Sequence, residues 1–139
     1  MSDARTLYDA LIDAWNRRNA DQYAELFEED GVIIGFDGSE VLGREAIREH
    51  LRGIFENHPT ATYVTKVREV RDFGDVALLR AVAGMIPPGG GDLMPDRHAQ
   101  QTLITRDRVV LFQNTPAQFH GRPEAVEALT AELREEVAK

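Results

Sequence analysis

The chain has 139 residues, of which 42% are hydrophobic and 29% are charged, so one folded domain over residues 1–139 is expected. It contains no cysteine, which excludes disulfides, a thiol nucleophile and thiolate metal sites. A formal net charge of -8 disfavours nucleic acid as a partner, because an acidic surface repels a phosphate backbone.

Two helices are expected at the start of the chain. The first runs from Asp3 to Arg18 with Ser2 as its N-cap, because apolar residues recur at the three- and four-residue spacing of one helical face. Those residues are Ala4, Leu7, Tyr8, Leu11, Ala14 and Trp15. Asn19 interrupts the pattern and caps a shorter helix. The apolar face of this second helix holds Tyr23, Leu26 and Phe27.

A short hairpin and a third helix follow. The Asp-Gly pair at 30–31 is a turn signal, and the Val-Ile-Ile run at 32–34 predicts a short strand. A second Asp-Gly pair at 37–38 predicts a tight turn that folds the next few residues back onto this strand. From Gly43 to Phe55, the spacing predicts a helix with an apolar stripe and His50 at the edge of that stripe.

Four longer strands complete the expected sheet. They span residues 62–73, 76–86, 97–106 and 109–115. The Pro-Gly run at 87–91 separates the second from the third, and it is interpreted either as a slack loop or as a flexible lip over a pocket mouth. A surface helix from Pro123 to Val137 ends the chain, since proline fits the first helical position.

This order of elements, with two helices, a short hairpin, a third helix and a long meander, resembles the nuclear transport factor 2-like superfamily. The motifs DAWNRRN at 13–19, YAELFEEDG at 23–31 and GREAIREHL at 43–51 are similar to its opening and to its third helix. The resemblance implies a cone-shaped α+β fold, in which N-terminal helices pack on a curved antiparallel sheet and enclose a pocket. The helix at 123–137 would be an addition on the surface.

Three later motifs carry a narrower resemblance. QTLITRD at 101–107, FQNT at 112–115 and FHGRPEAVEALTAELRE at 119–135 look like the SgcJ/EcaC group of that superfamily. Its members occur in actinomycete secondary metabolism, including enediyne polyketide pathways. The resemblance implies a SnoaL-like pocket protein for a small apolar or polyketide-like ligand. It also implies a homodimer packed through the outer face of the sheet.

Amide side chains on the last two strands are the first candidates for the pocket. Strand alternation places Gln101 and Leu103 on one face and His98 on the other, while Phe112 and Asn114 share a face. Gln101 and Asn114 are therefore predicted to fix and polarise a ligand carbonyl. The alternatives are a capping or solvated glutamine, and a structural network that ties strand to helix through the asparagine.

Aromatic and imidazole side chains are the second set of candidates. Trp15 either belongs to the core or roofs the pocket, and Tyr8 is a candidate to present its hydroxyl inward. His50 is a candidate to face the cavity from its helix. His98 is the acid–base candidate, since imidazole titrates near neutral pH, and the alternative is an exposed residue at the start of a strand.

Metal and cofactor sites are not expected. The four histidines, at 50, 58, 98 and 120, form no local ligand pair such as HxH or HExxH. The sequence also has no GxGxxG or Walker-type loop, so a nucleotide cofactor is not predicted. This argues against the oxidoreductase label often given to the SgcJ/EcaC group.

Ketosteroid isomerase and the SnoaL-type cyclases resemble this chain at the level of fold, and both use an acidic residue on the concave surface. Here the first strand has no carboxylate, and Asp37 lies in a turn, so neither mechanism is carried over. Three functions stay open. They are a cofactor-free cyclase, isomerase or dehydratase-like enzyme, a non-catalytic ligand carrier or accessory protein, and a structural adaptor with a collapsed pocket.

The sequence also bears on location. The opening MSDARTLYDA has neither the basic nor the apolar region of a signal peptide, and no apolar run approaches the roughly 20 residues of a membrane span. Together with the absence of cysteine, this predicts a cytoplasmic protein without membrane partners.

Overall fold

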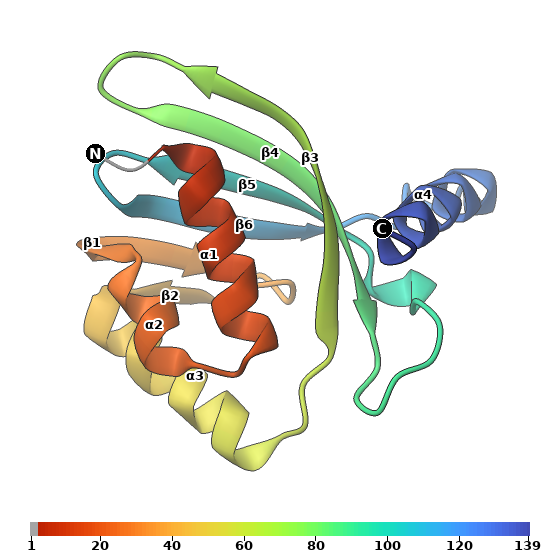
Figure 1. The fold of residues 1–139 in the computed structure, drawn as a ribbon, viewed down its shortest axis with the longest axis horizontal. Helices are drawn as coiled ribbons and strands as arrows, with labels where there is room; N and C mark the ends of the chain where they lie inside the picture. Colours follow the sequence, from red (N-terminus) through yellow and green to blue (C-terminus); the bar gives the residue numbers. More distant parts are fainter. Residues whose placement is uncertain (1–2) are drawn as a thin grey trace.

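Three helices form one layer of the computed structural model, which describes residues 3–139 (Figure 1). They are α1 (Ala4–Asn16), α2 (Ala20–Glu25) and α3 (Arg44–Asn57). The side chain of Asp3 caps α1 by accepting a 2.8 Å hydrogen bond from the backbone N–H of Thr6, whereas Ser2, the expected cap, lies outside the described residues. Asn19 caps α2 as predicted, through the backbone N–H of Gln22 at 3.0 Å.

A six-stranded sheet forms the second layer, and its strands follow the order β2-β1-β6-β5-β4-β3. Their bounds are β1 (Phe27–Ile34), β2 (Glu40–Leu42), β3 (Thr62–Asp72), β4 (Ala77–Ile86), β5 (Ala99–Thr105) and β6 (Val109–Pro116). The α+β class is as predicted, but the sheet is mixed rather than wholly antiparallel because β1 and β6 pair in parallel. No local signal marks this pairing, since the two strands lie far apart in the sequence.

The strand β1 begins earlier than expected. The Asp-Gly pair at 30–31 lies inside β1 instead of forming a turn, and the register against β6 shifts between Phe27 and Val32. A Cβ atom on Gly31 would lie 2.9 Å from the carbonyl oxygen of Val109. The glycine therefore permits the close approach of β6 at an irregular point of the strand, which is a recurrent use of glycine in sheets.

The main core lies between the concave face of the sheet and the three N-terminal helices (Figure 1). Its largest fully buried side chains include Tyr8, Leu11, Phe27, Ile47, Leu51, Leu79, Leu103 and Phe112. The helix face predicted for α1 supplies two of these, Tyr8 and Leu11, so the periodicity located the buried side correctly. Within the described residues, no helix combines the length and apolarity needed to cross a membrane.

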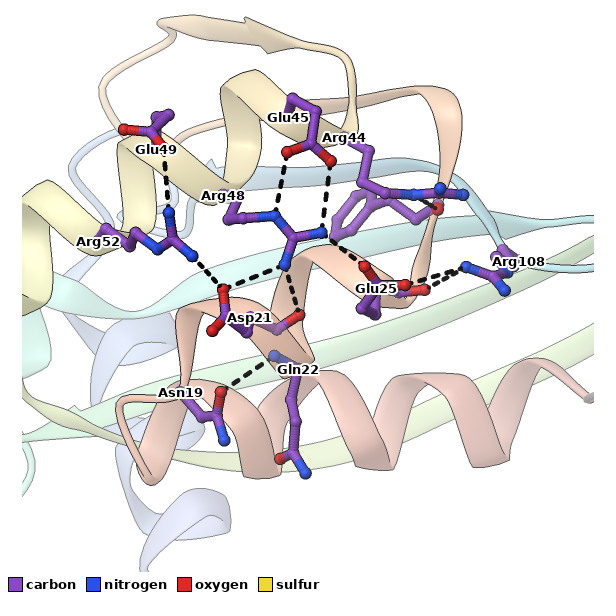
Figure 2. Close-up of polar contacts among 11 residues, drawn as sticks. Asn19, Asp21, Gln22, Glu25, Arg44, Glu45, Arg48, Glu49, Arg52 and Arg108 are labelled. Atoms are coloured by element: carbon purple, nitrogen blue, oxygen red, sulfur yellow. Dashed lines mark hydrogen bonds and ion pairs between the residues drawn. The ribbon is translucent and has the colours of Figure 1, made fainter.

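The helices α2 and α3 are joined by a network of ion pairs centred on Arg48 (Figure 2). Its guanidinium contacts Asp21 at 3.1 Å, Glu25 at 2.6 Å and Glu45 at 3.2 Å, and its side chain is 13% exposed. These partners raise the pKa of Arg48, and the same contacts lower the pKa values of Asp21 and Glu25. The network thus ties α3 to α2.

We expect Arg48→Met to lower the midpoint of thermal unfolding by about 3 °C in low salt. Methionine keeps the packing of the aliphatic stem but removes the ion pairs, which salt screens. The difference from the parent should therefore shrink at 1 M NaCl, as measured by circular dichroism. A difference of equal size at both salt concentrations would mean that packing, and not charge, is responsible.

The helix α4 (Pro123–Val137) has the predicted bounds and lies on the other side of the sheet, against β3 and β4 (Figure 1). Its buried residues Leu129 and Leu133 pack with Val82 and Leu93 in a second, smaller cluster. Charged contacts border this cluster. Glu132 pairs with Arg68 and Lys66, and Arg134 pairs with Asp92 at 2.6 Å.

His98 lies beneath α4 and is fully buried. Its Nε2 lies 2.6 Å from the Thr130 hydroxyl, which itself donates to the Val126 carbonyl, so Nε2 is the donor and Nδ1 carries no proton. Nδ1 has no hydrogen-bond partner. The alternative of an exposed strand-start histidine is wrong, because α4 folds over this position.

Burial lowers the pKa of His98, and the nearby charge of Asp96 opposes that effect. The folded state thus favours the neutral ring, so the contribution of His98 to stability is present above its unfolded pKa and is lost as the pH falls. We expect the urea midpoint to fall from pH 7.5 to pH 5, and to fall less in His98→Gln. Trp15, the single tryptophan, reports unfolding. An equal fall of the urea midpoint in the parent and in His98→Gln would exclude His98 as the source of the pH dependence.

Candidate functional site

A cavity of about 380 Å³ lies between the concave face of the sheet and the helices α1 and α3. Its apolar lining consists of Trp15, Ile33, Phe36, Leu51, Ile54, Met85 and Ala99. Its polar lining consists of Tyr23, Asp37, Ser39, His50, Tyr63, Arg97 and Asn114. A largely apolar wall with a few polar groups, at this volume, is typical of a small-molecule site.

A larger hollow of about 610 Å³ lies outside this cavity, near Arg18 and the end of α3. It is broadly open to solvent and mainly polar, so it is a surface groove and a weaker candidate. Pro88 and Gly89 line this groove. The Pro-Gly loop therefore borders the outer groove, not the cavity that Asn114 lines.

Hydrogen bonds connect Asn114, which lines the cavity, to two buried side chains behind it. The Tyr8 hydroxyl donates to Gln101 Oε1 at 2.5 Å, and Gln101 Nε2 donates to Asn114 Oδ1 at 2.8 Å. Burial raises the pKa of Tyr8, so its hydroxyl stays protonated and donates. Because Oδ1 of Asn114 is occupied, its Nδ2 is the atom left for a ligand. We call these three residues the amide relay.

Two tyrosines, Tyr23 and Tyr63, also line the cavity. No hydrogen bond joins either hydroxyl to another residue among 3–139. Burial raises the pKa of Tyr63 to about 12 and the pKa of Tyr23 well above its ordinary value. Both hydroxyls are therefore protonated at neutral pH and able to donate to a ligand.

The rim of the cavity carries charged and titratable groups. The carboxylate of Asp37 accepts hydrogen bonds from the Ser39 hydroxyl at 2.6 Å and from the Ser39 backbone N–H at 3.0 Å. These bonds, together with the nearby His50, lower the pKa of Asp37. Asp37 is therefore ionised and weakly basic. His50 and Arg97 line the rim from α3 and from the 3₁₀ helix η1 (Pro95–Arg97).

The predicted site residues divide into three groups. Trp15, His50 and Asn114 line the cavity. Gln101 lies one layer behind Asn114, and Tyr8, Leu103 and Phe112 belong to the core beneath. His98 lies on the opposite face of the sheet and is separated from the cavity by β5. Of the two amides, Asn114 alone reaches the cavity.

Trp15 takes both of the positions considered for it. It lines the cavity, and it also packs against Phe55 and Tyr63 with ring centroids 5.4 Å away in each case. Its indole N–H donates to the carbonyl of Ala61 at 2.9 Å, which holds the ring in place. Trp15 is thus a fixed part of the cavity wall.

Sequence reasoning missed the two cavity tyrosines and Arg97. Tyr63 shares the concave face of β3 with Thr65 and Val67, while charged residues mark the opposite face, and this alternation was the available signal. The sequence predicts Tyr23 only as a core residue, because a helical pattern of apolar residues does not show whether a buried tyrosine borders a cavity. Among residues 3–139, no group of three or more histidine, aspartate or glutamate side chains is placed to hold a metal ion.

Comparisons with known proteins bear on this architecture. A family model described as a SnoaL-like domain matches residues 4–120. No curated protein matches the sequence. Among solved structures, a domain of unknown function with a cystatin-like fold from Nostoc punctiforme has a TM-score of 0.76 and 24% identity, over 96% of this chain and 89% of that chain.

Two further solved structures are similar. An NTF2-like protein with a cystatin-like fold from Novosphingobium aromaticivorans has a TM-score of 0.69 and 20% identity, over 89% of this chain and 86% of that chain. A ketosteroid isomerase-like protein from Erwinia carotovora atroseptica has a TM-score of 0.64 and 17% identity, over 82% of this chain and 93% of that chain. At these identities the likeness concerns the fold alone.

Proposed function

The chain belongs to the SnoaL-like domain family, and from that premise we propose that it is a cofactor-independent cyclase or isomerase-like enzyme of polyketide-type secondary metabolism in the cytoplasm. Its substrate is a small apolar carbonyl compound that occupies the 380 Å³ cavity. The observation that carries the proposal is the convergence of unpaired hydrogen-bond donors on that cavity. These donors are Asn114 Nδ2 and the hydroxyls of Tyr23 and Tyr63.

Donors held in a buried, apolar site stabilise negative charge that develops on a carbonyl oxygen. Removal of a proton from the carbon next to the carbonyl forms an enolate, whose charge rests on that oxygen. The amide relay orients Asn114 before the substrate arrives, so no reorganisation is needed at the moment of reaction. We assign the proton transfer to His50, because an imidazole can both accept and donate a proton and His50 is the imidazole in the described lining.

Deuterium exchange at C1 of 2-tetralone, followed by NMR in D₂O, tests this function. The ketone is apolar and small, and exchange requires the proton abstraction that both a cyclase and an isomerase perform. Exchange above the buffer rate that saturates with ketone concentration supports the proposal. Exchange at the buffer rate, with 2-tetralone shown to bind, contradicts it.

The second candidate is a non-catalytic carrier that holds a reactive carbonyl intermediate. It is favoured by the low basicity of Asp37, since no strongly basic carboxylate lines the cavity in the described chain. Binding without exchange in the same experiment would support the carrier. A structural adaptor, in contrast, predicts a collapsed pocket and is disfavoured by the open cavity.

We further propose a homodimer through the part of the outer sheet face that α4 leaves uncovered. The strand register aligns Val32, Leu111, Ile104 and Leu78 in one partly exposed apolar row across four strands. Such a row is suited to pack against its own copy. We expect Ile104→Glu to give a monomer in light scattering. Val137→Glu, a matched change at an exposed position of α4, should leave the dimer intact. A dimer that survives both changes would exclude this face.

A further inference from the structure

The backbone at Arg97 is anchored at the rim of the cavity. Arg97 ends η1, and this element lies between two buried residues, Leu93 before it and His98 directly after Arg97. The backbone of η1 is tied by the Met94 N–H to the Met85 carbonyl at 2.9 Å, and by the Gln118 side chain to the Pro95 carbonyl at 3.0 Å. A side chain on such an anchored element can select a ligand group, because its position does not depend on a mobile loop.

Arg97 is exposed and is one of the residues that line the cavity, and its side chain has no ion pair or hydrogen bond to residues 3–139. Most other arginines of this acidic protein are paired, as Arg134 is with Asp92 and Arg106 is with Glu28. Asp37, the one carboxylate in the described lining, is already engaged by Ser39. An unpaired arginine at the mouth of an apolar cavity is suited to bind a carboxylate by two parallel hydrogen bonds.

The separation between Arg97 and the inner donors sets the length of the ligand. Gln101, the partner of Asn114, lies four positions after Arg97, and Ala99 between them also lines the cavity. At about 3.3 Å per residue of strand, with a shorter rise in η1, the backbone positions of Arg97 and Gln101 lie roughly 10 Å apart, and we take this as the approximate length of the ligand. This length corresponds to a skeleton of two fused rings.

We propose that the cavity selects apolar keto acids, with the carbonyl on Asn114 inside and the carboxylate on Arg97 at the mouth. The inference rests on the proposed function, because it assumes that the carbonyl end binds the amide relay. It adds a specificity-determining residue and the class of substrate.

Two probe compounds distinguish the contributions that the two ends of the ligand make to affinity. The first is 6-acetyl-2-naphthoate, which carries both groups, and the second is 2-acetylnaphthalene, which lacks the carboxylate. Their dissociation constants are measured by calorimetry with the full chain at 50 mM salt. We expect the keto acid to bind about 10-fold tighter than the ketone, since a charge-assisted hydrogen bond contributes on the order of 1.5 kcal/mol.

Variants of the protein identify the residue that causes the difference in affinity between the two probes. Arg97→Gln should remove the 10-fold preference and leave the affinity for 2-acetylnaphthalene unchanged. Arg5→Gln, which removes the same charge from an exposed position on α1, should keep the preference. The inference is overturned if both probes bind the parent equally, or if Arg97→Gln keeps the preference.

Failure of the proposed function is recognised separately. In that case neither probe binds the parent, or Asn114→Ala leaves both affinities unchanged, whatever the behaviour of Arg97→Gln. Either result would show that Asn114 does not bind the carbonyl end of the ligand, and the inference about Arg97 would then be overturned as well. A similar weakening of both affinities in Asn114→Ala, with the keto acid still bound about 10-fold tighter than the ketone, supports the two-ended site.

Discussion

Asn114→Ala should reduce saturating exchange of 2-tetralone by about 100-fold, which corresponds to the loss of one donor to a developing oxyanion. The change removes Nδ2, the free donor of the amide relay, without adding bulk to the cavity. The effect should fall on the turnover rate more than on the Michaelis constant, because the bond strengthens as negative charge develops on the oxygen. Both parameters follow from the NMR rates over a range of ketone concentrations.

Phe36→Leu is the matched control for this prediction. Phe36 also lines the cavity, but it contributes apolar surface and no donor. Its replacement should alter the Michaelis constant with little change in turnover rate. If Asn114→Ala and Phe36→Leu have similar effects on both parameters, Asn114 acts only by filling space, and the polarisation step is wrong.

Much of the fold follows from periodicity in the sequence. The nuclear transport factor 2-like architecture is confirmed, and so are the cap at Asn19 and the bounds of α4. What the sequence does not reveal is non-local. The parallel pairing of β1 with β6 and the burial of His98 under α4 both depend on segments that meet only after folding.

The candidate site illustrates the same limit. Alternation places Gln101 and Asn114 correctly on one face, because side chains in a strand point alternately to opposite sides. It does not give the depth of a residue beneath that face. Asn114 borders the cavity with 8% exposure, while Gln101 is 1% exposed and covered by Tyr8. Depth depends on which helix lies above, and two neighbouring amides therefore have different surroundings.

Gln101→Leu should reduce the free energy of unfolding by roughly 2–6 kcal/mol. Leucine fills a similar volume, but it leaves the Tyr8 hydroxyl and Asn114 Oδ1 without partners, and each buried unpaired group costs about 1–3 kcal/mol. Urea unfolding monitored by Trp15 fluorescence measures the change. A loss below about 0.5 kcal/mol would mean that the two groups find other partners. The expected loss would show that Gln101 stabilises the fold, but it would not show that Gln101 positions Asn114 for catalysis.

Gln101→Glu distinguishes the two roles through pH. In its neutral form the new carboxyl donates its O–H to Asn114 and accepts from Tyr8, as the glutamine does, so Asn114 still presents Nδ2 to the cavity. In its ionised form it only accepts, and Asn114 must turn its amide and present the oxygen instead. Burial raises the pKa of a carboxyl. The exchange rate of 2-tetralone with this variant is divided by the parent's rate at each pH. This ratio should be close to one at low pH and should fall as the pH rises through the pKa of the introduced carboxyl. A purely structural role predicts a constant ratio to the parent at every pH at which the variant is folded.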